Sequence, residues 1–340
     1  MKTKNYLTIA ALTFLLGFRS IQGAVDETGH LFITGSDSVA PPSTTGDIFL
    51  WVPSEDAFKG GNVSSTTYLS SSSLGYRSFA YGYNPTSSGS YSVAFGYYPV
   101  ASGQYSFAAG AYSESTGYAS SAFGYGSDSY GLYSFSNGYY ADALGNHSVA
   151  FGNYSEASGS YSVCFGYSND SLGYGSFTVG EQNIATDDYS TAFGFTNQST
   201  GVSSFAIGRF NIASGDDATA LGYDTQVSGW TSIASGYHNR VTNMTAAAFG
   251  QFLDVTTWDS TAVGVANDAS VLGSGSSRPL FMVGNGTVDY QGDPDSNGNN
   301  IGDSDDIASE RKNALVVYAN GYTELKVEPK GGIDMGSFDQ

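Results

Sequence analysis

The sequence has few of the residues on which catalytic and metal sites usually depend. Among 340 residues there are one cysteine, three histidines and only 12 lysines and arginines, against 31 aspartates and glutamates. A single cysteine excludes an intrachain disulfide, and we expect Cys164, which occupies a slot that is usually alanine, to be a small buried filler. The net charge of −19 repels phosphate backbones, so nucleic acid is not expected as a partner.

Long apolar runs are also absent, except near the N-terminus. Lys2 and Lys4 precede an apolar run from Tyr6 to Phe18, and the small residues Gly23 and Ala24 follow it. This order is typical of a secretory signal peptide, which we place at residues 1–24. The alternative is a retained membrane anchor, but the run is shorter than the roughly 20 residues that a membrane span needs. We therefore expect the protein to be exported.

Glycine, in contrast, is abundant and strictly spaced. From Gly75 to Gly264 every seventh residue is glycine, with Asp187, Asn243 and Thr257 as the exceptions. The residues before every second glycine follow the pattern Ser-x-Ala-x-Gly, so the full repeat spans two glycine intervals. A heptad coiled coil is excluded because glycine destabilises a helix in nearly every repeat.

The alternation of small and large residues predicts β-strands. Ser, Ala and Gly alternate with larger residues, such as Val93 and Phe95, and a period of two is the strand period. Each repeat then supplies two short strands and two corners, and we expect the glycines at the corners because only glycine tolerates the bend. The sequence predicts an all-β fold, a parallel β-roll solenoid with 14-residue coils and small β caps.

The two ends differ from the repeats in composition. Residues 25–72 are predicted to form an N-terminal β cap, residues 73–266 the β-roll repeats, and residues 267–340 a C-terminal β cap or connector with an acidic loop at 289–306. The expected cap strands are His30–Ile33 and Asp47–Val52 at the N-terminal end, and Pro279–Val283, Ala314–Ala319 and Tyr322–Val327 at the C-terminal end. Asn320-Gly321 is a hairpin turn signal between the last two strands.

An interior of small residues would place the larger apolar residues on the outside. Such a stripe exceeds the apolar area that soluble monomers usually expose, so we expect identical chains to cover it by association. The predicted interface residues are Val93, Phe95, Val149, Phe151, Val163, Phe165, Phe205 and Ile207. In the alternative arrangement the large residues lie inside and the small ones face water, and no partner is needed.

The repeat resembles the head repeat of the YadA-like trimeric autotransporter adhesins. The pattern Ser-Val-Ala-Phe-Gly-x-x-x-x-Ala-Ser-Gly at residues 92–103 and 148–159 agrees with the family in period, register and residue type. The resemblance implies a left-handed parallel β-roll, with three chains packed through the Val and Ile positions. It also implies a surface protein, because family members bind collagen and other matrix proteins.

The chain departs from the family pattern in two respects. Tyr91, His147 and Tyr161 stand where the family motif prefers Asn, and Phe is the commonest residue in the Ile slot. No heptad stalk follows the repeats, and the C-terminal residues do not resemble a translocator barrel. We therefore expect no self-encoded membrane anchor.

Two further groups of residues are candidate binding sites. Tyrosine follows the principal glycine in several repeats, and such a column would bind protein or sugar through its large area or would stabilise the solenoid by stacking. Its members are Tyr83, Tyr97, Tyr125, Tyr139, Tyr167, Tyr223 and Tyr237. Asp293, Asp295, Asn297 and Asp303 alternate around a glycine as in a calcium loop, and the alternative is a solvated acidic loop.

No residues have the spacing of a catalytic site. His30, His147 and His238 are isolated from one another, without the neighbours that a metal site or a triad needs. We expect no enzymatic activity, and no cofactor except calcium. The sequence predicts a bacterial surface or secreted adhesin whose trimeric head binds an extracellular protein or glycan, and the alternative is a structural fibre or spacer without a dedicated ligand.

Overall fold

The computed structural model describes residues 32–33, 45–52, 55–267, 278–285, 287–289, 307–310 and 313–325. The chain divides into two compact units, residues 1–175 and residues 176–340. Both are built almost entirely from β-strands, and short 3-10 turns lie at the start of the first unit. The predicted signal peptide and calcium loop lie outside the described residues.

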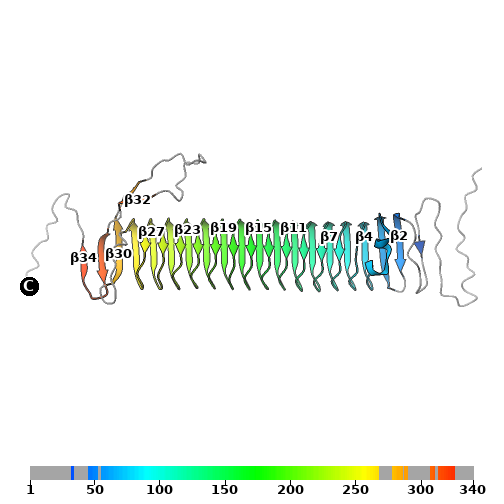
Figure 1. Ribbon diagram of the computed structural model, residues 1–340, viewed down its shortest axis with the longest axis horizontal. Coiled ribbons are helices and arrows are strands. Elements are labelled where there is room, and N and C mark those ends of the chain that lie inside the picture. The colour runs from blue at the N-terminus through cyan, green and yellow to red at the C-terminus, as the bar shows by residue number, and fades with distance from the viewer. Residues whose placement is uncertain are drawn as a thin grey trace, which may run out of the picture. The chain divides into compact units, whose positions relative to one another are not determined.

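The first unit is a parallel β-solenoid in which each coil contributes one long and one short strand (Figure 1). Successive strands of each kind pair in parallel and in the same register, for example Phe135↔Val149. The long strands are β4 (Phe79–Tyr83), β5 (Val93–Tyr97), β7 (Phe107–Ala111), β9 (Ser121–Tyr125), β11 (Phe135–Tyr139), β13 (Val149–Asn153) and β15 (Val163–Tyr167). The short strands are β6 (Val100–Ala101), β8 (Glu114–Ser115), β10 (Asp128–Ser129), β12 (Asp142–Ala143), β14 (Glu156–Ala157) and β16 (Asp170–Ser171). The predicted 14-residue coil is confirmed.

A β-hairpin caps the first unit at its N-terminal end. Strands β2 (Gly46–Val52) and β3 (Ala57–Val63) pair antiparallel, β1 (Phe32–Ile33) pairs in parallel with β2, and β3 pairs in parallel with β4. Two 3-10 turns, η2 (Thr66–Leu69) and η3 (Ser71–Ser73), follow β3. The hairpin therefore supplies the edge onto which the first coil is added.

One charged side chain is buried in this cap. The Lys59 ammonium donates hydrogen bonds to the Tyr68 carbonyl and to Ser73 Oγ, the latter at 3.1 Å. Burial lowers the pKa of Lys59 to about 7. The two acceptors lie on η2 and η3, so this lysine ties both turns to β3.

Small side chains fill the interior of the first unit. Ala94, Ala122 and Ala150 in the long strands are fully buried, and so is Cys164, which pairs with Ala150 in the register of the next coil. The larger residues between them point outward. The prediction of a small interior and a buried cysteine is confirmed, and the alternative with large residues inside is wrong.

Several inward serines satisfy their hydroxyl groups within their own coil. Ser120 Oγ and Ser148 Oγ donate to the carbonyls of Gly117 and Gly145, three residues earlier, at 2.8 and 2.7 Å. A hydroxyl bonded to its own corner needs no partner from the neighbouring coil. These serines close the corners of their own coils, whereas the buried hydroxyls of Ser78, Ser106 and Ser162 at the same position have no hydrogen-bond partner among the described residues.

The position of the principal glycines differs from the prediction. Gly124 lies inside strand β9 and not at a corner, with φ of +120°. The next coil also approaches so closely that a Cβ on Gly124 would overlap the carbonyl oxygen of Gly138. Glycine is therefore required by the backbone conformation together with the spacing of the coils.

The corners contain left-handed residues that are not glycine. Tyr91, Tyr98, Tyr105 and Tyr112 have φ between +53° and +61°. The backbone N–H of Tyr105 donates to the carbonyl of Ser90 in the preceding coil at 2.9 Å. Hydrogen bonds between coils hold these corner residues in a conformation that bulky side chains rarely adopt.

The second unit repeats the same coil. Its long strands are β17 (Phe177–Glu181), β19 (Thr191–Phe195), β21 (Phe205–Arg209), β23 (Thr219–Tyr223), β25 (Ile233–Tyr237), β27 (Ala247–Gln251) and β29 (Thr261–Val265). Its short strands are β18 (Ile184–Ala185), β20 (Gln198–Ser199), β22 (Ile212–Ala213), β24 (Gln226–Val227), β26 (Arg240–Val241) and β28 (Asp254–Val255). Successive strands of each kind again pair in parallel and in register, as Arg240↔Asp254 shows.

Antiparallel strands cap the second unit. Strand β30 (Pro279–Asn285) pairs in parallel with β29 and antiparallel with β33 (Asn313–Tyr318), which in turn pairs with β34 (Thr323–Leu325). Strands β31 (Thr287–Asp289) and β32 (Ile307–Glu310) form a separate antiparallel pair. The three strands predicted between residues 279 and 327 are therefore confirmed, with different ends.

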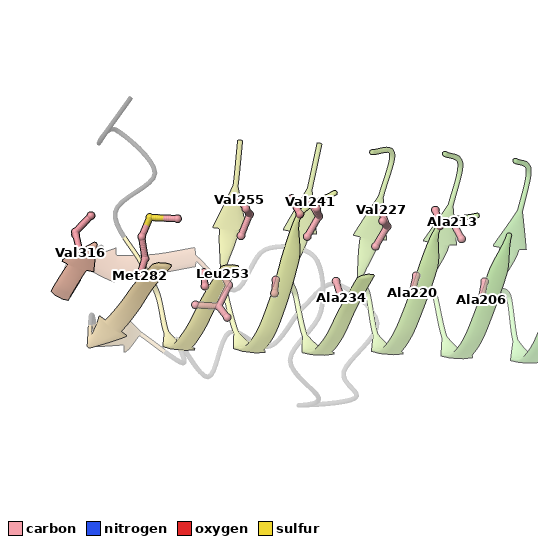
Figure 2. Close-up of a cluster of buried hydrophobic side chains, with 14 residues drawn as sticks. Ala206, Ala213, Ala220, Val227, Ala234, Val241, Leu253, Val255, Met282 and Val316 are labelled. Carbon is pink, nitrogen blue, oxygen red and sulfur yellow. The ribbon is translucent and has the colours of Figure 1, made fainter. Parts of the chain in front are cut away.

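The interior of the second unit becomes larger toward this cap. Ala206 and Ala213 give way to Val227, Val241 and Val255, and the cluster continues to the cap, as Figure 2 shows. The cap contributes Met282 and Val316, which are 2% and 0% exposed. A conventional apolar core thus replaces the serine-rich interior where the solenoid ends.

Candidate interaction surfaces

The outward face of the long strands carries the residues predicted to form a trimer interface. In the first unit the phenylalanines are well exposed, with Phe95 at 38%, Phe151 at 46% and Phe165 at 38%. Val149 pairs with Val163, and Phe151 with Phe165, so the apolar face continues between these coils, whereas Ala109 and Asn137 interrupt the column of phenylalanines. The remaining predicted residue of this unit, Val93, is half-buried on the same face.

The long strands of the second unit also carry apolar residues on their outward face. Phe205 and Ile207 are half-buried in strand β21, and Phe193 pairs with Ile207 in the neighbouring coil. Phe249 is 43% exposed. All the predicted interface residues therefore point out of the coil, in two sets that belong to the two units.

The predicted tyrosine column lies at the corner that follows each long strand. Tyr83 stacks on Tyr97 with ring centroids 4.9 Å apart, and Tyr125 stacks on Tyr139 at 5.2 Å. Tyr167 occupies the same position and is 46% exposed, but Ala111 and Asn153 interrupt the stacking between these tyrosines. We call this set, Tyr83, Tyr97, Tyr125, Tyr139 and Tyr167, the first tyrosine column.

A neighbouring column was not predicted. Tyr98 stacks on Tyr112 at 5.6 Å and Tyr140 on Tyr154 at 5.8 Å, one residue after the positions of the first column. Edge contacts join the two columns, as between Tyr139 and Tyr140 at 4.7 Å. The sequence signal was present, because tyrosines recur at these positions in successive repeats.

The other corner of the coil, after each short strand, carries aromatic rings as well. Tyr91 stacks on Tyr105 at 5.1 Å, and His147 lies between Tyr133 and Tyr161 at 5.1 and 4.8 Å. Tyr91, His147 and Tyr161 are the residues that replace Asn in the repeat motif. The departures from the motif thus build an aromatic column along this corner.

Ring stacking leaves mainly the edges and hydroxyl groups of these tyrosines exposed. In the stacked pair of Tyr83 and Tyr97 the ring planes differ by 14°, so each ring covers a face of the other. The hydrogen bond with Tyr112 raises the pKa of Tyr97 above its usual value. The columns can donate and accept hydrogen bonds along a regular row, and their stacking also stabilises neighbouring coils.

In the second unit the same corner is more varied. Tyr223 stacks on Tyr237 at 5.1 Å, as predicted for this pair. The Arg209 guanidinium lies 4.9 Å from the centre of the Phe195 ring and 6.0 Å from that of Tyr223, within the range of a cation–π contact. The tyrosine hydroxyl row of the first unit is therefore not continued in the same form.

A column of carboxylates runs along the short strands of the first unit. Each acidic residue pairs in register with the next, and no lysine or arginine occurs between Arg77 and Arg209. The column consists of Glu114, Asp128, Asp142, Glu156 and Asp170. Burial, with the charges of Asp128 and Glu156, raises the pKa of Asp142 to about 6.

We expect this column to make the first unit more stable at mildly acidic pH. The folded pKa of Asp142 lies above its ordinary value of 3.8, so the folded state binds more protons and gains stability as the pH falls from about 6 toward 4. Asp142→Asn should raise the free energy of unfolding at pH 7 by about 1 kcal/mol, after allowance for solvent screening. Urea unfolding at pH 7 and pH 4 measures this, and an equal gain at both values would contradict the explanation.

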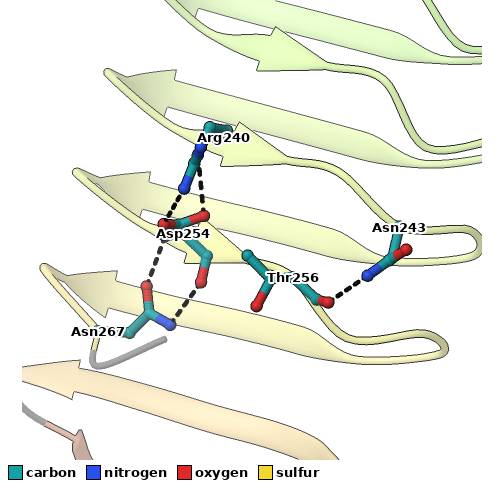
Figure 3. Close-up of polar contacts among 5 residues, drawn as sticks. All are labelled: Arg240, Asn243, Asp254, Thr256 and Asn267. Atoms are coloured by element: carbon teal, nitrogen blue, oxygen red, sulfur yellow. Dashed lines mark hydrogen bonds and ion pairs between the residues drawn. The ribbon is translucent and has the colours of Figure 1, made fainter. Parts of the chain in front are cut away.

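The last two short strands of the second unit place opposite charges at the position where the first unit has carboxylates. Arg240 forms a bidentate ion pair with Asp254 of the next coil, with Nε to Oδ1 at 3.1 Å and Nη2 to Oδ2 at 2.5 Å (Figure 3). Asn267 then holds the backbone of Asp254 through two hydrogen bonds, at 2.7 and 2.9 Å. These contacts lock the last coils of the unit in register.

The predicted calcium site cannot be placed among the described residues. Asp293, Asp295, Asn297 and Asp303 lie outside the described residues. Among the residues that are described, no group of three or more His, Cys, Asp or Glu side chains is arranged to hold a metal ion. In the same part of the chain no helix is long and apolar enough to cross a membrane.

Comparison with known proteins identifies the repeat. The family model of the YadA head domain repeat matches residues 87–113, 101–127, 143–169, 172–197 and 199–225. These segments contain long and short strands of both units. No curated protein matches the chain.

Proposed function

We propose that the protein, in which five segments between residues 87 and 225 match the YadA head domain repeat, is an exported adhesin that acts at the bacterial surface or outside the cell. Three chains associate through the outward face of the long strands. The assembled head binds an extracellular protein or glycan through its tyrosine columns. We assign no catalytic step to it.

The observation that carries the trimer is the exposed apolar face. Phe95, Phe151 and Phe165 are more than one third exposed, and the half-buried valines Val93, Val149 and Val163 lie two residues before them on the same parallel strands. Burying such a face against copies of itself removes apolar area from water at roughly 25 cal/mol per Å². Identical chains offer identical stripes with the same spacing, which favours symmetric association.

Sedimentation of the purified mature protein tests the trimer. We expect the mass of three chains, and dissociation to single chains when Phe151→Asp and Phe165→Asp are combined, because two charges would be buried in an apolar contact. Leu144→Asp is the matched control, since Leu144 is 37% exposed and follows a short strand on another face. A wild-type monomer would contradict the proposed assembly.

Attachment to immobilised matrix proteins and glycans tests the adhesive role. Weak contacts repeated along each chain, multiplied by association, are expected to give high avidity. Replacing Tyr97, Tyr125 and Tyr139 with Ser should then abolish saturable attachment while circular dichroism remains unchanged. The same replacement at Tyr105 and Tyr133, on the other corner, is the control. Absence of saturable attachment by the wild type would favour the spacer role, and attachment that survives loss of the first tyrosine column would contradict the assignment of binding to that column.

A further inference from the structure

The second unit exposes three large side chains at one corner. Trp230 and Trp258 are each 60% exposed, and Met244 between them is 43% exposed. They occupy the same position in three successive coils, after strands β24, β26 and β28. Neither indole stacks on an aromatic ring in the described part of this unit, in contrast to the tyrosine columns.

The seven-residue spacing of glycines is interrupted beside these three side chains. Asn243 and Thr257 replace the seventh-position glycine immediately before Met244 and Trp258. The Trp258 indole N–H donates to Asn243 Oδ1 at 3.0 Å. The Asn243 amide in turn donates to the Thr256 carbonyl of the next coil (Figure 3). Asn243 therefore fixes the edge of one indole, which a glycine could not do.

The backbone under the patch is held at a regular spacing. Thr245 N–H donates to the Trp230 carbonyl at 2.9 Å, and Asp259 N–H to the Met244 carbonyl at 3.2 Å. The short strands of these coils pair in register. Two coil steps therefore place the indoles roughly 9.5 Å apart, a separation close to that of every second sugar in an extended β-linked polysaccharide.

The chemistry around the indoles favours an uncharged sugar chain. A flat, uncovered indole packs well against the C–H face of a sugar ring. Thr231, Thr245 and Asp259 lie beside the tryptophans and supply hydroxyl and carboxylate groups for sugar hydroxyls, with Thr245 Oγ1 already donating to Asp259 at 2.7 Å. The net charge of −19 repels anionic polymers.

We propose that Trp230 and Trp258 form a binding platform for a neutral β-linked polysaccharide, with alternate sugars of one chain stacked on the two indoles. This inference rests on the proposed adhesive function and names a ligand class for it. Met244 lies under the intervening sugar. Asn243 acts as a positioning residue for Trp258.

Titration of the full-length protein with soluble β-1,4-linked gluco-oligosaccharides of increasing length tests the platform. We expect quenching of tryptophan fluorescence, and an affinity that rises until the oligosaccharide covers both indoles. Trp230→Ala and Trp258→Ala should each weaken binding about tenfold or more and abolish the length dependence. Binding should change little with salt, because the ligand is uncharged.

Tyr189→Ala is the matched control, since Tyr189 is a 58% exposed aromatic residue at the same kind of corner, and it should bind like the wild type. Thermal unfolding verifies that each variant is folded. Absence of oligosaccharide binding, or equal binding by the double tryptophan variant, would overturn the inference. If attachment to matrix protein persists in either case, the adhesive function stands and only the sugar platform is wrong.

Discussion

Replacing Gly124 with alanine is expected to unfold the coils of the first unit under conditions in which the wild type is stable. Gly124 has φ of +120°, and a Cβ there would overlap the Gly138 carbonyl oxygen of the next coil. That oxygen belongs to the backbone of strand β11, so it can move only if the strands separate. We expect a loss of more than about 4 kcal/mol in the free energy of unfolding.

A second glycine separates the two causes of this loss. Gly46 has nearly the same φ, +123°, but apart from its two chain neighbours no atom lies within 4 Å of a Cβ built there. Gly46→Ala should therefore cost only about 1–2 kcal/mol, which is the strain of the left-handed backbone. Urea unfolding followed by circular dichroism compares the two variants. Equal losses would show that the close approach of the coils contributes nothing.

The coil itself could be predicted from the sequence because its causes are local and repeated. The alternation of Ala94 with Val93 and Phe95 specifies a strand with one small face, and the repeat period specifies how strands stack. The burial of Ala94 and the exposure of Phe95 follow from that pattern. The outward stripe of apolar residues was therefore visible in the sequence alone.

The place of the glycines could not be predicted in the same way. A glycine at every seventh residue is compatible with a corner. It is equally compatible with a strand position at which the next coil leaves no room for a Cβ, as at Gly124. Composition does not indicate that Tyr98 and Tyr112 adopt positive φ, since isolated tyrosine avoids that region. Hydrogen bonds between coils impose both features. They are properties of the stack and not of one repeat.

Other features are visible in the sequence only when each position of the repeat is compared separately between coils. The carboxylates from Glu114 to Asp170 are separated by whole repeats, and so are Trp230 and Trp258. The asparagines of the second unit, including Asn183, Asn197 and Asn211, share this spacing. Their role, in contrast, depends on burial, which the sequence does not show. In the structure these asparagines are fully buried.

Asn197→Ala is expected to destabilise the second unit almost as strongly as the glycine variant destabilises the first. The Asn197 amide donates to the carbonyls of Phe193 and Gly208, both at 2.8 Å. Its Oδ1 accepts from the backbone N–H and the side-chain amide of Asn211, both at 3.0 Å. Alanine would remove these four hydrogen bonds; the Asn211 amide keeps its bonds to the Ile207 and Gly222 carbonyls, and each buried group that loses its partner costs about 1–3 kcal/mol before relaxation. We therefore expect a total loss of about 3–5 kcal/mol.

Asn197→Thr is the matched control, because Thr225 occupies this column naturally. The Thr225 hydroxyl lies 3.4 Å from the Gly236 carbonyl, and its backbone N–H donates to Asn211 Oδ1 at 3.0 Å. Threonine at position 197 should therefore recover part of the loss by reaching one carbonyl. Trp230 and Trp258 lie in the same unit, so their fluorescence reports its unfolding in urea when Trp51 of the first unit is replaced with Phe in every variant compared. If alanine and threonine proved equally stable, the hydrogen bonds of the asparagine column would not hold the coils together, and the packing of its neighbours would have to account for the stability of the unit.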